Sequence, residues 1–180
     1  SAASDVYKRQ GYDSPQHTVV LSSDYYMCKY EVTRSLWYAI MNDSIVTEEG
    51  MLPMTHITWN DAEAFTKKLN KLTGLPFSLP TEAQWEYAAA GGESYPYAGS
   101  DNIRDVAYYA SNANERLHPV GEKRENGFDL YDMSGNAAEW CTDWMSRYEN
   151  TRGTDPQGPA ENPGHHKKLS LIHISEPTRP

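Results

Sequence analysis

Two short segments near the ends of the chain limit which residues can belong to one native fold. Residues 5–10 read DVYKRQ, which the codons GATGTGTATAAGAGACAG encode, and the reverse complement of that string encodes LSLIHI, the sequence of residues 169–174. A natural gene has no reason to begin and end on reverse complements, and the shared string resembles the adapters of transposase-based sequencing libraries. We therefore expect residues 1–10 and 169–180 to be adapter-derived and non-native, leaving residues 11–168 as a partial domain.

The remaining stretch has the size of one domain, and its five Trp and most of the thirteen Tyr of the chain favour an aromatic-rich core. Cys28 and Cys141 are far apart in sequence and do not form a C-x-x-C pair, so neither is typical of a redox motif. We expect two unpaired, small apolar side chains, with one disulfide between them as the open alternative. The compartment stays undetermined, with an extracytoplasmic one preferred over the cytoplasm.

The charge of the chain restricts its partners. The formal net charge is −9 at pH 7, which argues against nucleic acid as a partner. Carboxylates and carbonyls are the ligands of calcium, so the excess of acid suits a domain that binds hard cations, although it also suits a plain soluble surface. No apolar run reaches the length that a membrane span requires.

The first part of the chain predicts a hairpin followed by a helix. Residues 17–21 and 25–32 are rich in β-branched and aromatic residues and are separated by a Ser-Ser-Asp turn, which favours two paired strands. Thr33 is a candidate N-cap for a helix that packs on this hairpin through Leu36, Trp37, Ile40 and Met41. Residues 42–53 are expected to form a loop.

Two further helices have clear start and stop signals. Thr58 is expected to begin one that ends at Gly74, and Thr81 with Gln84 forms a capping box for one that ends at Gly91. The apolar stripes of these helices are predicted to comprise Ala62, Phe65, Leu69 and Leu72 in the first, and Trp85 and Ala88 in the second. Residues 93–129 should be mostly irregular, and residues 154–168 a surface loop.

Two long motifs carry a resemblance to a known family. LPTEAQWEYAAAGG at residues 79–92 and LYDMSGNAAEW at residues 130–140 are similar to signatures of the formylglycine-generating-enzyme, or sulfatase-modifying-factor, family. Shorter matches lie in the family's order, namely YEVT at 30–33, ITWNDA at 57–62, PVG at 119–121 and DW at 143–144. The resemblance covers nearly all of residues 14–160. It implies an α+β, C-type-lectin-like fold with short helices on a small twisted sheet, little regular structure and an incomplete C-terminus.

The resemblance also implies a structural calcium site in the second motif. Asp132 and Glu139 would be its charged ligands, and the backbone carbonyls of Gly135 and Ala137 would complete it. Such a loop suits calcium, because a glycine lets the backbone turn its carbonyls inward between two flanking carboxylates. In the alternative interpretation, Asp132 is a cap and Glu139 a solvated charge. We expect His165 and His166, beside two lysines, to be solvated loop residues and not metal ligands.

Catalysis in this family resembles copper-dependent oxidation of a substrate cysteine by oxygen, with two enzyme cysteines as the copper site. In the family, those cysteines follow an Arg-Gly-Gly segment downstream of the region around Pro159. In this chain the predicted adapter segment begins before any such Arg-Gly-Gly segment occurs. Cys28 and Cys141 do not match them, so we expect no catalytic residue in this chain. Copper would be bound in a full-length parent, whose partner would be a protein or peptide substrate of the sulfatase type.

Three hypotheses follow for the full-length parent protein. In the first, it oxidises a cysteine of a sulfatase-type protein to formylglycine. In the second, it is a non-catalytic binding or structural module, similar to a surface lipoprotein, with the same fold. The third, an iron-dependent sulfoxide synthase relative, would need a histidine-rich helical domain upstream. Three departures from the family pattern weaken the first hypothesis and motivate the second, since Ser78 and Ala90 stand where the family usually has Arg and Ala138 where it has Trp.

Overall fold

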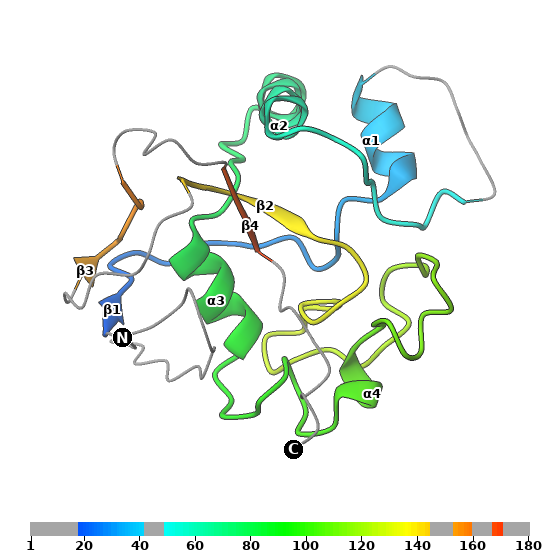
Figure 1. Cartoon of the computed structure of the whole chain (residues 1–180). Coiled ribbons are helices and arrows are strands. Elements are labelled where there is room, and N and C mark those ends of the chain that lie inside the picture. Colours follow the sequence, from blue (N-terminus) through cyan, green and yellow to red (C-terminus); the bar gives the residue numbers. More distant parts are fainter. Residues whose placement is uncertain (1–17, 42–48, 145–152, 160–166, 171–180) are drawn as a thin grey trace.

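A computed structural model of the chain describes residues 18–41, 49–144, 153–159 and 167–170 (Figure 1). These parts hold short helices, two two-stranded sheets and long irregular connections. The helices are α1 (Arg34–Met41), α2 (Trp59–Thr73), α3 (Glu82–Ala90) and α4 (Ile103–Val106); the strands are β1 (Val19–Val20), β2 (Glu139–Trp144), β3 (Gly153–Thr154) and β4 (Lys167–Ser170). The expected α+β organisation with little regular structure is confirmed. None of the described helices is long and apolar enough to cross a membrane.

The two small sheets join distant parts of the chain. β1 pairs in parallel with β3, Val19 opposite Gly153, and β2 pairs antiparallel with β4, Trp140 opposite Leu169. In Figure 1, β2 and β4 cross the middle of the fold between α2 and α3. Two residues of the segment predicted to be adapter-derived, 169 and 170, thus extend the edge of a sheet, as an apolar, β-prone run can do. The origin of both terminal segments stays a prediction.

The helices α2 and α3 begin and end where the sequence predicts. Both have a reciprocal capping box: Thr58 with Asp61, and Thr81 with Gln84, exchange side-chain and backbone hydrogen bonds of 2.8–3.2 Å. Each helix ends at a glycine with positive φ, Gly74 at 73° and Gly91 at 62°. Local chemistry alone therefore fixes the two helices that frame β2.

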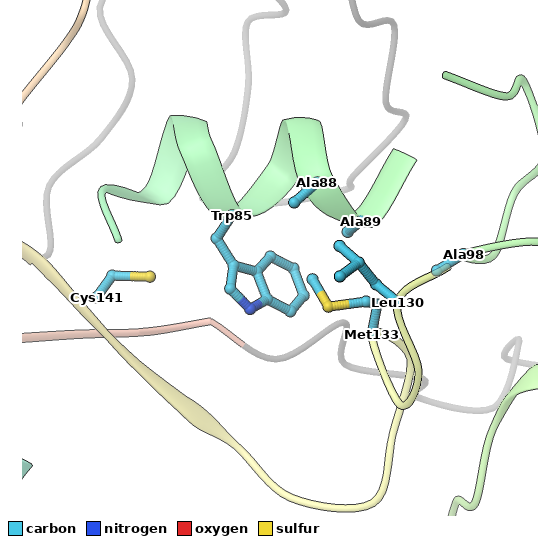
Figure 2. Packing of buried hydrophobic residues seen from close by; sticks show 7 residues of the cluster. All are labelled: Trp85, Ala88, Ala89, Ala98, Leu130, Met133 and Cys141. Atoms are coloured by element: carbon cyan, nitrogen blue, oxygen red, sulfur yellow. The ribbon is translucent and has the colours of Figure 1, made fainter. Parts of the chain in front are cut away.

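The core lies between α3, β2 and the loop before β2. The buried cluster comprises Trp85, Ala88, Ala89, Ala98, Leu130, Met133 and Cys141 (Figure 2). Figure 2 shows the Trp85 ring pointing out from α3 toward Met133, and Cys141 on the strand beside it. A second aromatic contact stacks Trp37 on Phe65, with ring centroids 4.9 Å apart, and joins α1 to α2. Cys141 is buried and Cys28 exposed, and no disulfide joins the two.

The predicted hairpin is wrong. Val19–Val20 is a strand, but its partner is β3, and residues 25–32 form no strand. The backbone of that segment bonds elsewhere: the Lys29 carbonyl accepts from Tyr131 and the Val32 carbonyl from Met54. Consequently α1 packs on α2 and not on a hairpin. The predicted buried faces of α1 and α2 are also wrong at one residue each, because Leu36 and Leu72 are exposed.

Candidate metal centre

The loop from Asp132 to Glu139 has an unusual backbone. Asp132, Gly135 and Asn136 all have positive φ, at 58°, 88° and 57°. At Gly135 a side chain has no room, since an added Cβ would lie 2.1 Å from the carbonyl oxygen of Tyr108. The same oxygen accepts a 2.9 Å hydrogen bond from the backbone N–H of Asn136. Because a trans peptide points its C=O opposite to its N–H, this bond directs the Gly135 carbonyl away from Tyr108.

Asp132 has one satisfied and one unsatisfied carboxylate oxygen. The residue is 4% exposed; its Oδ2 accepts a 2.7 Å hydrogen bond from the backbone N–H of Gly121. Oδ1 is buried and finds no hydrogen-bond partner among the described residues. Burial raises the pKa of Asp132, and the bond from Gly121 opposes that shift only in part. A buried carboxylate oxygen without a partner is costly, and a bound cation would compensate it.

Glu139 opens β2 with its carboxylate directed at the core. Its Oε2 accepts a hydrogen bond from the indole Nε1 of Trp85, a residue of the buried cluster. Burial raises the pKa of Glu139 to about 6, the Trp85 bond opposes this, and the charge of Asp132 adds to it. This is not the environment of a solvated surface charge, the role that Glu139 has in the alternative interpretation.

Glu31 joins the loop from a distant segment, and the sequence did not predict it as a site residue. It is 7% exposed, and its two carboxylate oxygens accept hydrogen bonds from the loop: Oε1 from the Ala137 N–H at 2.8 Å and Oε2 from the Asn136 side-chain amide at 2.7 Å. Burial, then the charges of Glu139 and Asp132, raise the pKa of Glu31 to about 9. The available signal was that Glu31 is the only acidic residue of the segment 25–32, within the YEVT match.

The residues of the loop fit calcium. The predicted ligands offer only oxygens, Asp132 keeps a buried Oδ1 without a partner among the described residues, and Asp132 lies near enough to Glu139 to raise its pKa. Within the described ranges, no three His, Cys, Asp or Glu side chains gather closely enough to hold a metal by themselves. A cation here would therefore need backbone carbonyls as well, such as those of Gly135 and Ala137. His165 and His166 lie outside the described residues.

Comparisons with known proteins define the class. The family described as "Sulfatase-modifying factor enzyme 1-like domain" matches residues 2–169. The formylglycine-generating enzyme of Streptomyces coelicolor is 38% identical, over 64% of this chain and 40% of its own length. Chaperone protein LppX of Paenibacillus barcinonensis is 31% identical, over 75% of this chain and 68% of its own length. Among solved structures, Treponema denticola variable protein 1 has a TM-score of 0.74 and 26% identity, covering 90% of this chain and 78% of that one.

The fold and the loop thus define a sulfatase-modifying-factor domain with C-type-lectin-like architecture. The chain belongs to the sulfatase-modifying factor enzyme 1-like family, which confirms the resemblance seen in its motifs. It spans only 40% of the Streptomyces enzyme, so that enzyme's activity does not transfer with the match. Of the three departures from the family pattern, Ser78 and Ala138 are exposed and Ala90 is buried.

Proposed function

We propose that this domain is a calcium-stabilised scaffold, in which the loop from Asp132 to Glu139 holds one Ca²⁺. Asp132 and Glu139 supply charge, and the carbonyls of Gly135 and Ala137 supply the remaining protein ligands. The observation that carries the proposal is the buried, unpartnered Oδ1 of Asp132, whose carboxylate lies near enough to Glu139 to raise the pKa of that residue. Calcium takes six to eight oxygens in flexible geometry, which a loop of mixed carboxylates and carbonyls can provide.

The electrostatics of the loop support this role. Glu31, Asp132 and Glu139 lie near one another at the edge of the core, and the pKa of each is raised mainly by burial. No described lysine or arginine forms an ion pair with any of them. Buried carboxylates ordinarily have a cationic partner or bind a metal. A calcium ion would supply the missing positive charge and link α3, β2 and the preceding loop into one unit.

Calcium removal and the substitution Glu139→Ala test this scaffold role in the full chain. At calcium a hundredfold above its dissociation constant, binding to the folded state adds about 2.7 kcal/mol. For a domain of this size that corresponds to roughly 5–10 °C in melting temperature. Chelation should lower the melting temperature of the unsubstituted protein by this amount, and it should change the melting temperature of Glu139→Ala very little. Scanning calorimetry with and without chelator measures both effects.

A surface carboxylate provides the control. Glu63 lies on α2 and forms an i,i+4 pair with Lys67 at 2.8 Å, so Glu63→Ala removes a charge far from the loop. Its melting temperature should keep the full calcium dependence. If chelation leaves the melting temperature of the unsubstituted protein unchanged, the loop is a packing feature and the ligand assignment fails.

A second candidate function belongs to a longer parent protein: oxidation of a cysteine in a sulfatase-type protein to formylglycine. The match to the Streptomyces formylglycine-generating enzyme favours it. Copper would then be held by two close thiolates. The thiols here do not suit that role. Cys141 is buried in the core, and for Cys28, an exposed residue, partial burial of the thiol and then the charge of Glu139 raise the pKa.

We accordingly expect this chain to show no cysteine oxidation, with or without added copper, on a peptide that carries a sulfatase-type cysteine. Mass spectrometry of the peptide detects the aldehyde product. The longer gene should supply two cysteines after an Arg-Gly-Gly segment, and their replacement by serine should abolish turnover. Turnover by the present chain that disappears on Cys28→Ser or Cys141→Ser would contradict this assignment.

A further inference from the structure

We propose that Glu31 is the positioning residue of the calcium loop: it is not a ligand, but it holds the loop in the shape that binds the ion. This inference rests on the proposed calcium function and extends it to a residue outside the predicted ligand set. Glu31 lies 105 residues before Asn136 in the chain, so the loop depends on a segment that no local sequence pattern connects to it.

The hydrogen bonds of Glu31 are directed at the two residues that shape the loop. Its Oε1 accepts from the backbone N–H of Ala137, a residue whose own carbonyl is a predicted ligand, and its Oε2 accepts from the side chain of Asn136. Asn136 has a φ of 57°, in the left-handed region that asparagine adopts more readily than most residues, and the Glu31 bond fixes the side chain of this turn residue. Because both of its oxygens already accept hydrogen bonds from the loop, we assign Glu31 the role of holding the loop through these contacts.

Asn136 extends this network to the other side of the loop. Its Oδ1 accepts from the backbone N–H of His118 at 3.1 Å, and its Nδ2 also donates to the His118 carbonyl at 3.2 Å. Three residues further on, Gly121 donates to Oδ2 of Asp132. Glu31 therefore fixes the side chain of Asn136, which in turn bonds to His118. The segment that begins at His118 also contains Gly121, the hydrogen-bond donor to the predicted ligand Asp132. Residues that orient metal ligands by hydrogen bonds typically contribute ten- to a hundredfold in metal affinity.

The substitution Glu31→Gln tests the inference in the full chain, since it keeps the shape of the side chain and removes one of its two acceptors. Calcium titration by calorimetry, and terbium luminescence sensitised by Trp85, which contacts Glu139, measure binding directly. We expect the calcium dissociation constant to rise about ten- to a hundredfold. Glu31→Asp, which keeps the carboxyl group and both acceptor oxygens, should recover part of the affinity.

Asp143→Asn is the matched control. Asp143 is also a buried carboxylate, 6% exposed, and its Oδ2 accepts a backbone N–H, that of Glu82, at the same 2.8 Å. The substitution should lower thermal stability and leave the calcium dissociation constant within about twofold. A purely structural role of Glu31 would give the same pattern, with stability lowered and affinity unchanged, and that result would overturn the inference.

The outcomes separate this inference from the calcium function itself. If the unsubstituted protein binds calcium and Glu31→Gln binds equally well, Glu31 is not a positioning residue and the calcium function stands. If neither protein binds, the calcium function fails and the inference fails with it. Should Glu31→Gln not fold, hydrogen exchange of the Ala137 amide decides: protection in chelator supports a loop held by Glu31, and exchange at the rate of an exposed amide contradicts it.

Discussion

Gly135→Ala is expected to destabilise the domain by about 4 kcal/mol or more, enough to unfold a protein of ordinary stability. The added Cβ would lie 2.1 Å from the carbonyl oxygen of Tyr108 and 3.3 Å from the Cβ of Ala107. The first contact is with backbone, which no side-chain rotation can relieve, so the loop or residues 107–108 must move. Such a shift would break the Asn136–Tyr108 hydrogen bond. The φ of 88° adds the cost of a left-handed alanine, about 1–2 kcal/mol.

Gly74→Ala separates the two causes. Gly74 ends α2 with a φ of 73°, but a Cβ there would have no atom within 4 Å. Its substitution should therefore show the backbone cost alone, about 1–2 kcal/mol. Urea denaturation, followed by Trp fluorescence, measures both variants. Equal losses of stability for the two substitutions would mean that the contact with Tyr108 relaxes without cost and that the tight loop is not required.

The helices show what the sequence could predict. The start and end of α2 and α3 depend on contacts within a few residues, such as the reciprocal bonds of Thr81 with Gln84 and the left-handed Gly91. These signals survive in a single sequence because they need no partner elsewhere in the chain. The extent of the buried face of a helix does depend on packing partners elsewhere in the chain. Leu72 is therefore exposed although it shares the helical spacing of Phe65.

Residues 25–32 show what the sequence could not predict. Their β-branched and aromatic composition favours a strand, but strand propensity reports a fit to neighbours that are absent from the local sequence. In the structure, Lys29, Glu31 and Val32 bond to residues 131, 137 and 54 respectively. The segment is an extended support for two loops and not one arm of a hairpin.

The candidate site likewise has residues that the sequence predicts and residues that only the structure reveals. The resemblance to the family supplied Asp132, Gly135, Ala137 and Glu139, because these residues lie within one continuous motif. The structure adds a reason for Gly135, whose close contact is with Tyr108, and it adds Glu31, whose bonds span more than a hundred residues. Both depend on tertiary contacts, which the spacing of residues within the motif does not contain.

In the absence of calcium, the stability of the domain should fall as the pH rises from about 5 to about 9. Burial raises the pKa of Glu31 from its ordinary 4.5 to about 9 and that of Glu139 from 4.5 to about 6. The folded protein thus binds protons that the unfolded chain releases above about pH 4.5. Stability from these two groups is fully present below that pH, and it is lost as the pH passes through about 6 and then about 9. Exposed carboxyls such as Asp61, whose pKa is lowered by the Thr58 hydroxyl and then by its N–H, oppose this trend only at more acid pH.

Calcium should reverse the trend, because the cation favours the ionised carboxylates and competes with the protons. We expect the gain in melting temperature on adding calcium to be small at pH 5 and largest near pH 8. Calorimetry across this range, in chelator and in saturating calcium, gives both curves. Glu31→Gln removes the group with the highest pKa, so in chelator its melting temperature should level off above about pH 7. A melting temperature in chelator that rises between pH 5 and pH 8 would show that the three carboxylates are ionised in the folded protein without a cation.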